Sequence, residues 1–135
     1  MMMTDVATAT TDAGGPGSTL VRRLVVINLA FVAFQALSAG FLMSGYAPAL
    51  KAHAIVAVAL QFGALMQAVA AVVPWRRRQV PAWVAGVSIG LLVIVFLQVG
   101  FGYRRLYWLH VPIGVGIFGA LTRQVNRLGT PWCAT

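Results

Sequence analysis

The sequence predicts an all-α protein, an integral membrane four-helix bundle with an up-down-up-down arrangement and both termini in the cytoplasm. The first reason is composition, since 60% of the 135 residues are hydrophobic and only 9% are charged. Soluble proteins average roughly 45–50% and about 25%. The second reason is that the apolar residues form four long continuous runs, whereas barrel strands alternate in polarity over about ten residues. A chain of this length forms one domain, in which lipid contact replaces the missing charge.

The four apolar runs predict the four membrane helices. They cover residues 24–44, 49–73, 81–103 and 106–121, the last reaching 128 if Arg123 extends its guanidinium to the interface. A helix needs about 20 residues to cross the hydrocarbon layer. The first three runs satisfy this, and Tyr107 and Trp108 anchor the fourth. Short links make successive helices antiparallel. The predicted domains are a disordered cytoplasmic tail at 1–19, the transmembrane domain at 20–128 and a short cytoplasmic tail at 129–135.

The charged residues predict the orientation. Asp5 and Asp12 are the only acidic residues. One side of the predicted bundle carries Arg22, Arg23, Arg76, Arg77, Arg78, Arg123 and Arg127, and the other side carries Lys51, Arg104 and Arg105. The positive-inside rule therefore places both termini in the cytoplasm of a multi-pass plasma-membrane protein. The cations lie at the ends of apolar runs and form no continuous basic stripe. The expected partner is the lipid bilayer and not a nucleic acid.

Two histidines are candidate metal ligands: His53 near the start of the second helix and His110 near the start of the fourth. Both helices run in the same direction, so both side chains enter from the outer face. Ionisable residues inside membranes are costly and indicate function. Two neutral imidazoles on parallel helices suit the axial positions of six-coordinate haem iron. The alternative is that both are interfacial residues wetted by headgroup water.

Residues near the histidines are compatible with haem b. Gly114, one turn below His110, leaves room for a flat macrocycle, and Arg104 and Arg105, or Lys51, would pair with the propionates. The alternative is that small residues serve close helix packing.

Gln35 and Gln98 are further candidates for cofactor binding. Each begins a Gln-then-Gly stretch that precedes a short loop and a histidine-bearing helix, which indicates two related helical hairpins. Either amide would bond a ligand, a propionate or the second nitrogen of a histidine. The alternative is that both link helices across the bundle.

A family resemblance rests on short motifs around these residues. Leu97-Gln98-Val99-Gly100-Phe101-Gly102 followed by Trp108-Leu109-His110, with one histidine on each even-numbered helix, resembles one four-helix half of heme A synthase. Phe34-Gln35, Ala52-His53 and Leu109-His110-Val111-Pro112 are similar to short uncharacterised four-helix membrane proteins of bacteria. The resemblance covers about residues 20–128. It implies a haem-binding scaffold. The acidic residue close to the first haem histidine of that family is missing here, so haem-oxidising chemistry is not implied.

The expected function is haem binding for electron transfer or haem handling by a small membrane protein. The alternative is a non-catalytic scaffold or accessory subunit, as a homodimer or within a larger membrane complex. An enzyme is not favoured. With no acidic residue in the membrane and the single cysteine, Cys133, near the C-terminus, no set of nucleophile, base and orienting residue is found.

Overall fold

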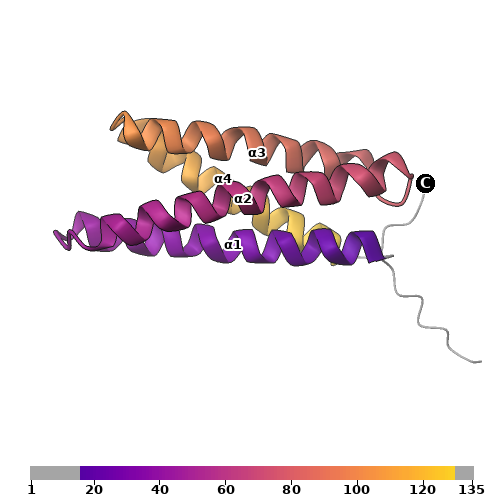
Figure 1. Ribbon diagram of the computed structural model, residues 1–135, viewed down its shortest axis with the longest axis horizontal. Coiled ribbons are helices and arrows are strands. Elements are labelled where there is room, and N and C mark those ends of the chain that lie inside the picture. Colours follow the sequence, from indigo (N-terminus) through magenta and orange to yellow (C-terminus); the bar gives the residue numbers. More distant parts are fainter. Residues whose placement is uncertain (1–15, 130–135) are drawn as a thin grey trace, which may run out of the picture.

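The computed structural model describes residues 16–129, which form four α-helices: α1 (Pro16–Met43), α2 (Ala49–Arg76), α3 (Ala82–Tyr103) and α4 (Tyr107–Leu128). The helices lie side by side along the long axis of the molecule (Figure 1). Each packs against two neighbours, in the order α1, α2, α3, α4 and back to α1, so α2 and α4 are diagonal to each other. The prediction of an all-helical fold is confirmed. Cys133 and most of both predicted tails lie outside the described residues.

Two helices are longer than the sequence predicted. α1 begins at Pro16 and not at residue 24, so the last residues of the predicted tail are helical. Packing fixes this first turn, since a side chain at Gly17 would meet the Pro74 ring at 3.0 Å. α2 continues past Pro74 to Arg76. Proline near the end of a helix removes a single hydrogen bond, and burial of Pro74 favours the continued helix.

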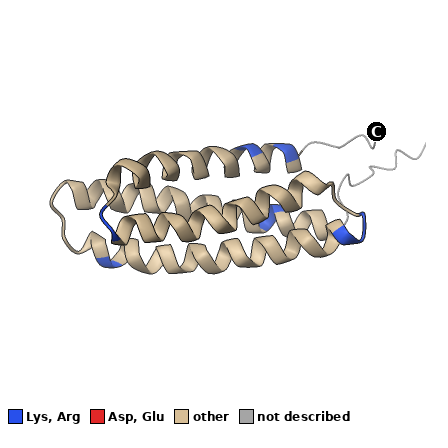
Figure 2. Cartoon of the chain, turned by 90° about the horizontal axis from the view of Figure 1, so that it is seen from above, with Lys and Arg blue, Asp and Glu red and all other residues tan. Residues whose placement is uncertain are grey.

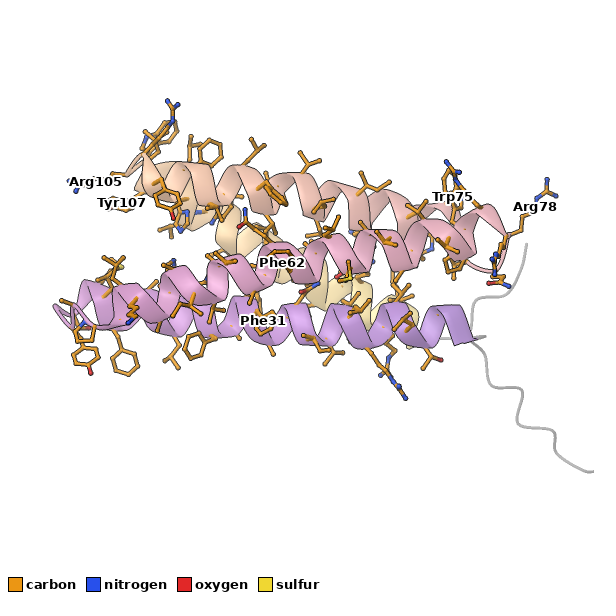
Figure 3. The ribbon with its side chains drawn as sticks, in the orientation of Figure 1. Phe31, Phe62, Trp75, Arg78, Arg105 and Tyr107 are labelled. Carbon is orange, nitrogen blue, oxygen red and sulfur yellow. The ribbon has the colours of Figure 1, made fainter. Side chains whose placement is uncertain are left out.

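The surface of the bundle is typical of a membrane protein. α1 from Gly17, α2 and α3 are long and apolar enough to cross a membrane. Large apolar side chains face outward, as Phe62 does with 65% of its surface exposed. Exposed Trp75 and Tyr107 lie near opposite ends of the bundle (Figure 3), where aromatic residues meet lipid headgroups. The last turns of α4 are more polar than those of the other helices.

The cations gather at the two ends of the bundle (Figure 2). At one end Gly17 of α1 lies against Pro74 of α2, and the Arg127 guanidinium lies 5.4 Å from the centre of the Trp83 ring. We call this the arginine-rich end. It carries Arg22, Arg23, Arg76, Arg77, Arg78, Arg123 and Arg127. The opposite end, which we call the histidine end, carries Lys51, Arg104, Arg105, His53 and His110.

The apolar core fills the middle of the bundle and the part near the arginine-rich end. On α2 and α4 it stops at Leu60 and Ile117, and on α1 and α3 at Val32 and Val95. These positions lie about two turns from the histidines on α2 and α4. Among the described residues, no large apolar side chain is buried at the level of the histidines. The packed core therefore ends before the candidate site.

The first three helices end in the same way. Each has the paired backbone hydrogen bonds of a Schellman motif. The left-handed residue of the motif is Gly45 after α1 (φ 87°), Arg78 after α2 and Arg105 after α3 (both φ 57°). A side chain is strained in this conformation, so two of the three turns hold an arginine at a cost in stability.

Candidate functional site

The two histidines lie close together although their helices are not neighbours. The ring centres of His53 and His110 are 6.1 Å apart, with their planes at 55°. α2 and α4 bring them together across the bundle, between α1 and α3. The expectation that both side chains enter the bundle at one end is met by this geometry.

Each imidazole is held by a hydrogen bond within its own helical hairpin. His53 Nδ1 lies 3.0 Å from Ser38 Oγ on α1, and His110 Nδ1 lies 2.9 Å from the backbone carbonyl of Gln98 on α3. The Ser38 hydroxyl donates its own proton to the Gln35 carbonyl at 3.0 Å. Ser38 Oγ is thus left to accept from His53.

The Gln98 carbonyl defines the tautomer of His110. A carbonyl can only accept, so His110 carries its proton on Nδ1, and His53 does the same when the Ser38 proton is donated to Gln35. Each Nε2 then has a lone pair, and within residues 16–129 neither Nε2 has a hydrogen-bond partner. A histidine fixed through Nδ1–H with Nε2 free is the arrangement of a metal ligand.

Gln35 and Gln98 occupy equivalent positions in the two hairpins. Gln35 Nε2 donates to the backbone carbonyl of His53 at 3.0 Å, and Gln98 Nε2 donates to that of His110. Both Oε1 atoms are buried, and among the described residues neither has a partner. Each amide nitrogen donates once here and carries a second N–H, so either side chain can donate to a bound group as well as accept from it.

Two glycines make room for these side chains. A Cβ at Gly102 would lie 3.2 Å from His110 Cε1, and one at Gly114 would lie 3.0 Å from Gln98 Nε2. Gly114, which the sequence predicted to leave space for a macrocycle, thus lies against the Gln98 amide. The absence of a side chain at Gly114 leaves space for the Gln98 side chain, which donates to the His110 carbonyl.

The cations predicted to pair with propionates are exposed at the histidine end. Arg104 follows α3, Arg105 forms the next turn, and Lys51 lies in the first turn of α2. Figure 3 shows Arg105 beside Tyr107 at this end of the bundle. No carboxylate among the described residues could pair with these three cations, so they suit an anionic group bound at the histidine end.

His53 and His110 are the residues that would hold haem iron. Their ring centres are 6.1 Å apart, a separation that two imidazoles with metal bonds of about 2.0–2.1 Å would also have if their Nε2 atoms faced one metal. Residues 16–129 contain no group of three or more His, Cys, Asp or Glu side chains that could hold a metal ion.

A second polar cluster lies deeper in the bundle, with one residue from each helix. Gln67 accepts from Asn28 Nδ2 at 2.8 Å and donates to Gln124 Oε1 at 3.0 Å and Ser88 Oγ at 3.3 Å. Gln124 also donates to Ser88 at 3.1 Å. All four side chains are buried. Gln67 thus links helices across the bundle, as glutamines in membrane helices commonly do, and the sequence patterns above did not point to Asn28, Ser88 or Gln124.

The two hairpins repeat, with one offset between α2 and α4 and a slightly longer one between α1 and α3. Gln67 and Gln124 are 57 residues apart, as are His53 and His110. Buried Val21 and Val32 of α1 have counterparts Val84 and Val95 in α3, at the offset that relates Gln35 to Gln98. This pattern would have paired Gln67 with Gln124, but it would not have identified Asn28 and Ser88, which correspond to the apolar residues Leu91 and Val25.

Comparison with known proteins adds no relative. No protein-family model matches the chain, and neither a curated protein nor a solved structure shows significant similarity to it. The resemblance to heme A synthase stays a prediction.

Proposed function

We propose that this protein binds haem b through His53 and His110, as a small b-type cytochrome or a haem-handling membrane protein. The observation that carries the proposal is the pair of imidazoles with ring centres 6.1 Å apart, each held through Nδ1. A histidine at the membrane interface needs no hydrogen bond that fixes its ring, whereas a metal-binding histidine almost always has one at its other ring nitrogen.

The residues around the pair have distinct roles in this proposal. Ser38 and the Gln98 carbonyl orient the rings and keep Nε2 unprotonated, and the Gln35 and Gln98 amides fix the histidine backbones. Arg104, Arg105 and Lys51 would neutralise the propionates at the rim. Haem held by two histidines supplies one-electron redox chemistry.

The proposal includes the placement of the chain in the plasma membrane. We place four crossings in an up-down-up-down arrangement, with the arginine-rich end and both termini in the cytoplasm. α4 has 22 residues, as α3 does, and a helix of that length spans about 33 Å. The excess of arginine at one end supports the orientation. The histidine pair then lies near the outer face.

The test is a visible absorption spectrum of protein purified in detergent after expression with ample haem. Sharp α and β bands on dithionite reduction, lost in both His53→Ala and His110→Ala, are the expected result. Each variant should keep the helical circular dichroism of the wild type, which separates loss of ligand from loss of fold. A folded wild-type protein without haem bands would refute haem binding.

A second candidate function is that of a scaffold or accessory subunit, as a homodimer or in a larger complex. Gly86 and Gly90 of α3 are exposed, and a Cβ at either would meet nothing within 4 Å. This Gly-x-x-x-Gly face suits close approach of another membrane helix. Substitution of Gly86 and Gly90 with leucine would then abolish cross-linking to itself or a partner, whereas the histidine variants would leave it unchanged.

A further inference from the structure

A pocket of about 320 Å³ lies between α1 and α2 at the histidine end of the bundle. Its lining consists of Phe34, Leu37, Ser38 and Phe41 of α1, Tyr46 and Pro48 of the following turn, and Ala49 and Ala52 of α2. Sites for small molecules have volumes of about 300–1,000 Å³. The large side chains of the lining are partly exposed, Phe34 at 42% and Phe41 at 54%. The pocket therefore opens on the outer surface of the bundle, which faces lipid in a membrane.

Small residues of α2 make this space, and the second hairpin has larger residues at the same positions. The interval between equivalent positions of α2 and α4 is 57 residues. At this interval, the counterparts of Ala49 and Ala52 are Leu106 and Leu109. Alanine in place of leucine is therefore a difference between two otherwise similar hairpins, and it lies on the wall of the pocket.

Ser38 supplies a polar group to the pocket and also holds His53. Its side chain is 3% exposed, and its counterpart in α3 is Phe101. The hydroxyl donates its proton to the Gln35 carbonyl at 3.0 Å, and its oxygen accepts from His53 Nδ1 at 3.0 Å. A hydroxyl has one proton to donate and two lone pairs, so one lone pair remains. A ligand in the pocket can therefore bond Ser38 by donating to it, and not by accepting from it.

The remaining lining restricts the ligand by shape and charge. Phe34, Phe41 and Tyr46 offer aromatic surface, and the rings of Phe41 and Tyr46 meet edge to face with their centres 6.3 Å apart. None of the described residues that line the pocket is charged, so a charged group would lose its hydration here without gaining a partner. An acyl chain would fill the apolar space but would leave Ser38 without a donor. A neutral, flat ring with a hydroxyl group satisfies the whole lining.

We propose that this pocket binds a membrane-soluble quinol, with its ring against the aromatic side chains and one hydroxyl donating to Ser38. A quinol is neutral and flat, and its apolar tail would follow the lipid-facing surface of the bundle. The oxidised quinone has a carbonyl in place of the hydroxyl and cannot donate, so the pocket selects the reduced form. Ser38 would then lie between the quinol and His53. The binding itself does not require haem.

The test is isothermal titration calorimetry of the purified protein in detergent without oxygen, with decylubiquinol as the probe. Decylubiquinone should bind about 2–10-fold more weakly, the factor for one net hydrogen bond. Ser38→Ala should remove this difference between the two forms. Ser44→Ala is the matched control and should keep the difference, since Ser44 is exposed, bonds the Gly40 carbonyl and does not line the pocket. Quinone binding as tightly as quinol to the wild type would overturn the proposal.

A second pair of variants tests the shape of the pocket. Ala52→Leu, which introduces the side chain of the second hairpin, should weaken decylubiquinol binding about 10-fold or more. Ala54→Leu adds the same side chain to an exposed position of α2 outside the pocket and should leave binding unchanged. Equal losses in the two variants would overturn the site. His110→Ala separates this proposal from haem binding, because it should lose haem and keep the quinol. A wild-type protein that binds quinol but no haem would refute the haem proposal alone.

Discussion

Gln67 donates a hydrogen bond to Gln124 across 3.0 Å, and these two residues follow His53 and His110 at the same interval along α2 and α4. The two diagonal helices thus meet through side chains at two levels, a pair of imidazoles near one end and a pair of amides deeper in the bundle. Both pairs join equivalent positions of the repeated hairpins. The candidate site therefore lies where equivalent positions of the two hairpins face each other.

Removal of the hydroxyl that holds His53 should weaken haem binding without abolishing the fold. Ser38→Ala takes away the acceptor of the Nδ1 proton, and loss of such a partner typically costs 10–100-fold in metal affinity. Haem titration followed by absorbance is the measurement. Ser44→Ala is the control, since Ser44 is exposed and bonds only the Gly40 carbonyl. Equal affinity in both variants would show that Ser38 does not orient the ring.

Loss of the central amide should destabilise the bundle. Gln67→Leu leaves Asn28, Ser88 and Gln124 without their shared partner, and we expect the free energy of unfolding to fall by about 1–3 kcal/mol. Unfolding in mixed detergent micelles, followed by circular dichroism, measures this. Gln61→Leu on the same helix should change little, because Gln61 is half-buried and makes no side-chain hydrogen bond within residues 16–129. A similar loss of stability in both variants would show that replacing any glutamine of α2 has this effect, and that the hydrogen-bonded cluster is not its cause.

Much of the fold could be predicted because apolar runs and short links restrict a membrane chain to few arrangements. The pairing of His53 with His110 followed from their helices running in the same direction. The hydrogen bonds of Gln35 and Gln98 to histidine carbonyls could not be predicted, since they depend on the rotation of each helix about its own axis. Asn28 and Ser88 were missed for the same reason. A lone polar residue in an apolar run does not reveal which neighbour it faces.

A methyl group at Gly63 should displace Asn28. A Cβ there would collide with Asn28 Oδ1, so the Asn28 side chain must rotate and lose its bond to Gln67. Gly63→Ala should therefore lower the free energy of unfolding by about 1–3 kcal/mol. Gly90→Ala meets open space and should be neutral or stabilising by up to about 1 kcal/mol, as alanine is the better helix former. Equal stability of the two variants would contradict a fixed position for Asn28.

The turn after α2 holds two neighbouring arginines at which substitution with glycine should change the free energy of unfolding in opposite directions. Arg78 is left-handed, with φ 57°, so Arg78→Gly relieves strain and should raise the free energy of unfolding by about 0.5–1 kcal/mol. Arg77 precedes it with φ −87°, where glycine relieves nothing and only adds freedom to the unfolded chain. Arg77→Gly should therefore lower stability by about 0.5–1 kcal/mol. Both variants remove one positive charge from the same end of the bundle, so a charge effect would move both the same way. Thermal unfolding in one detergent decides between these outcomes, and a shift of equal sign in both variants would show that charge, and not backbone strain, controls this turn.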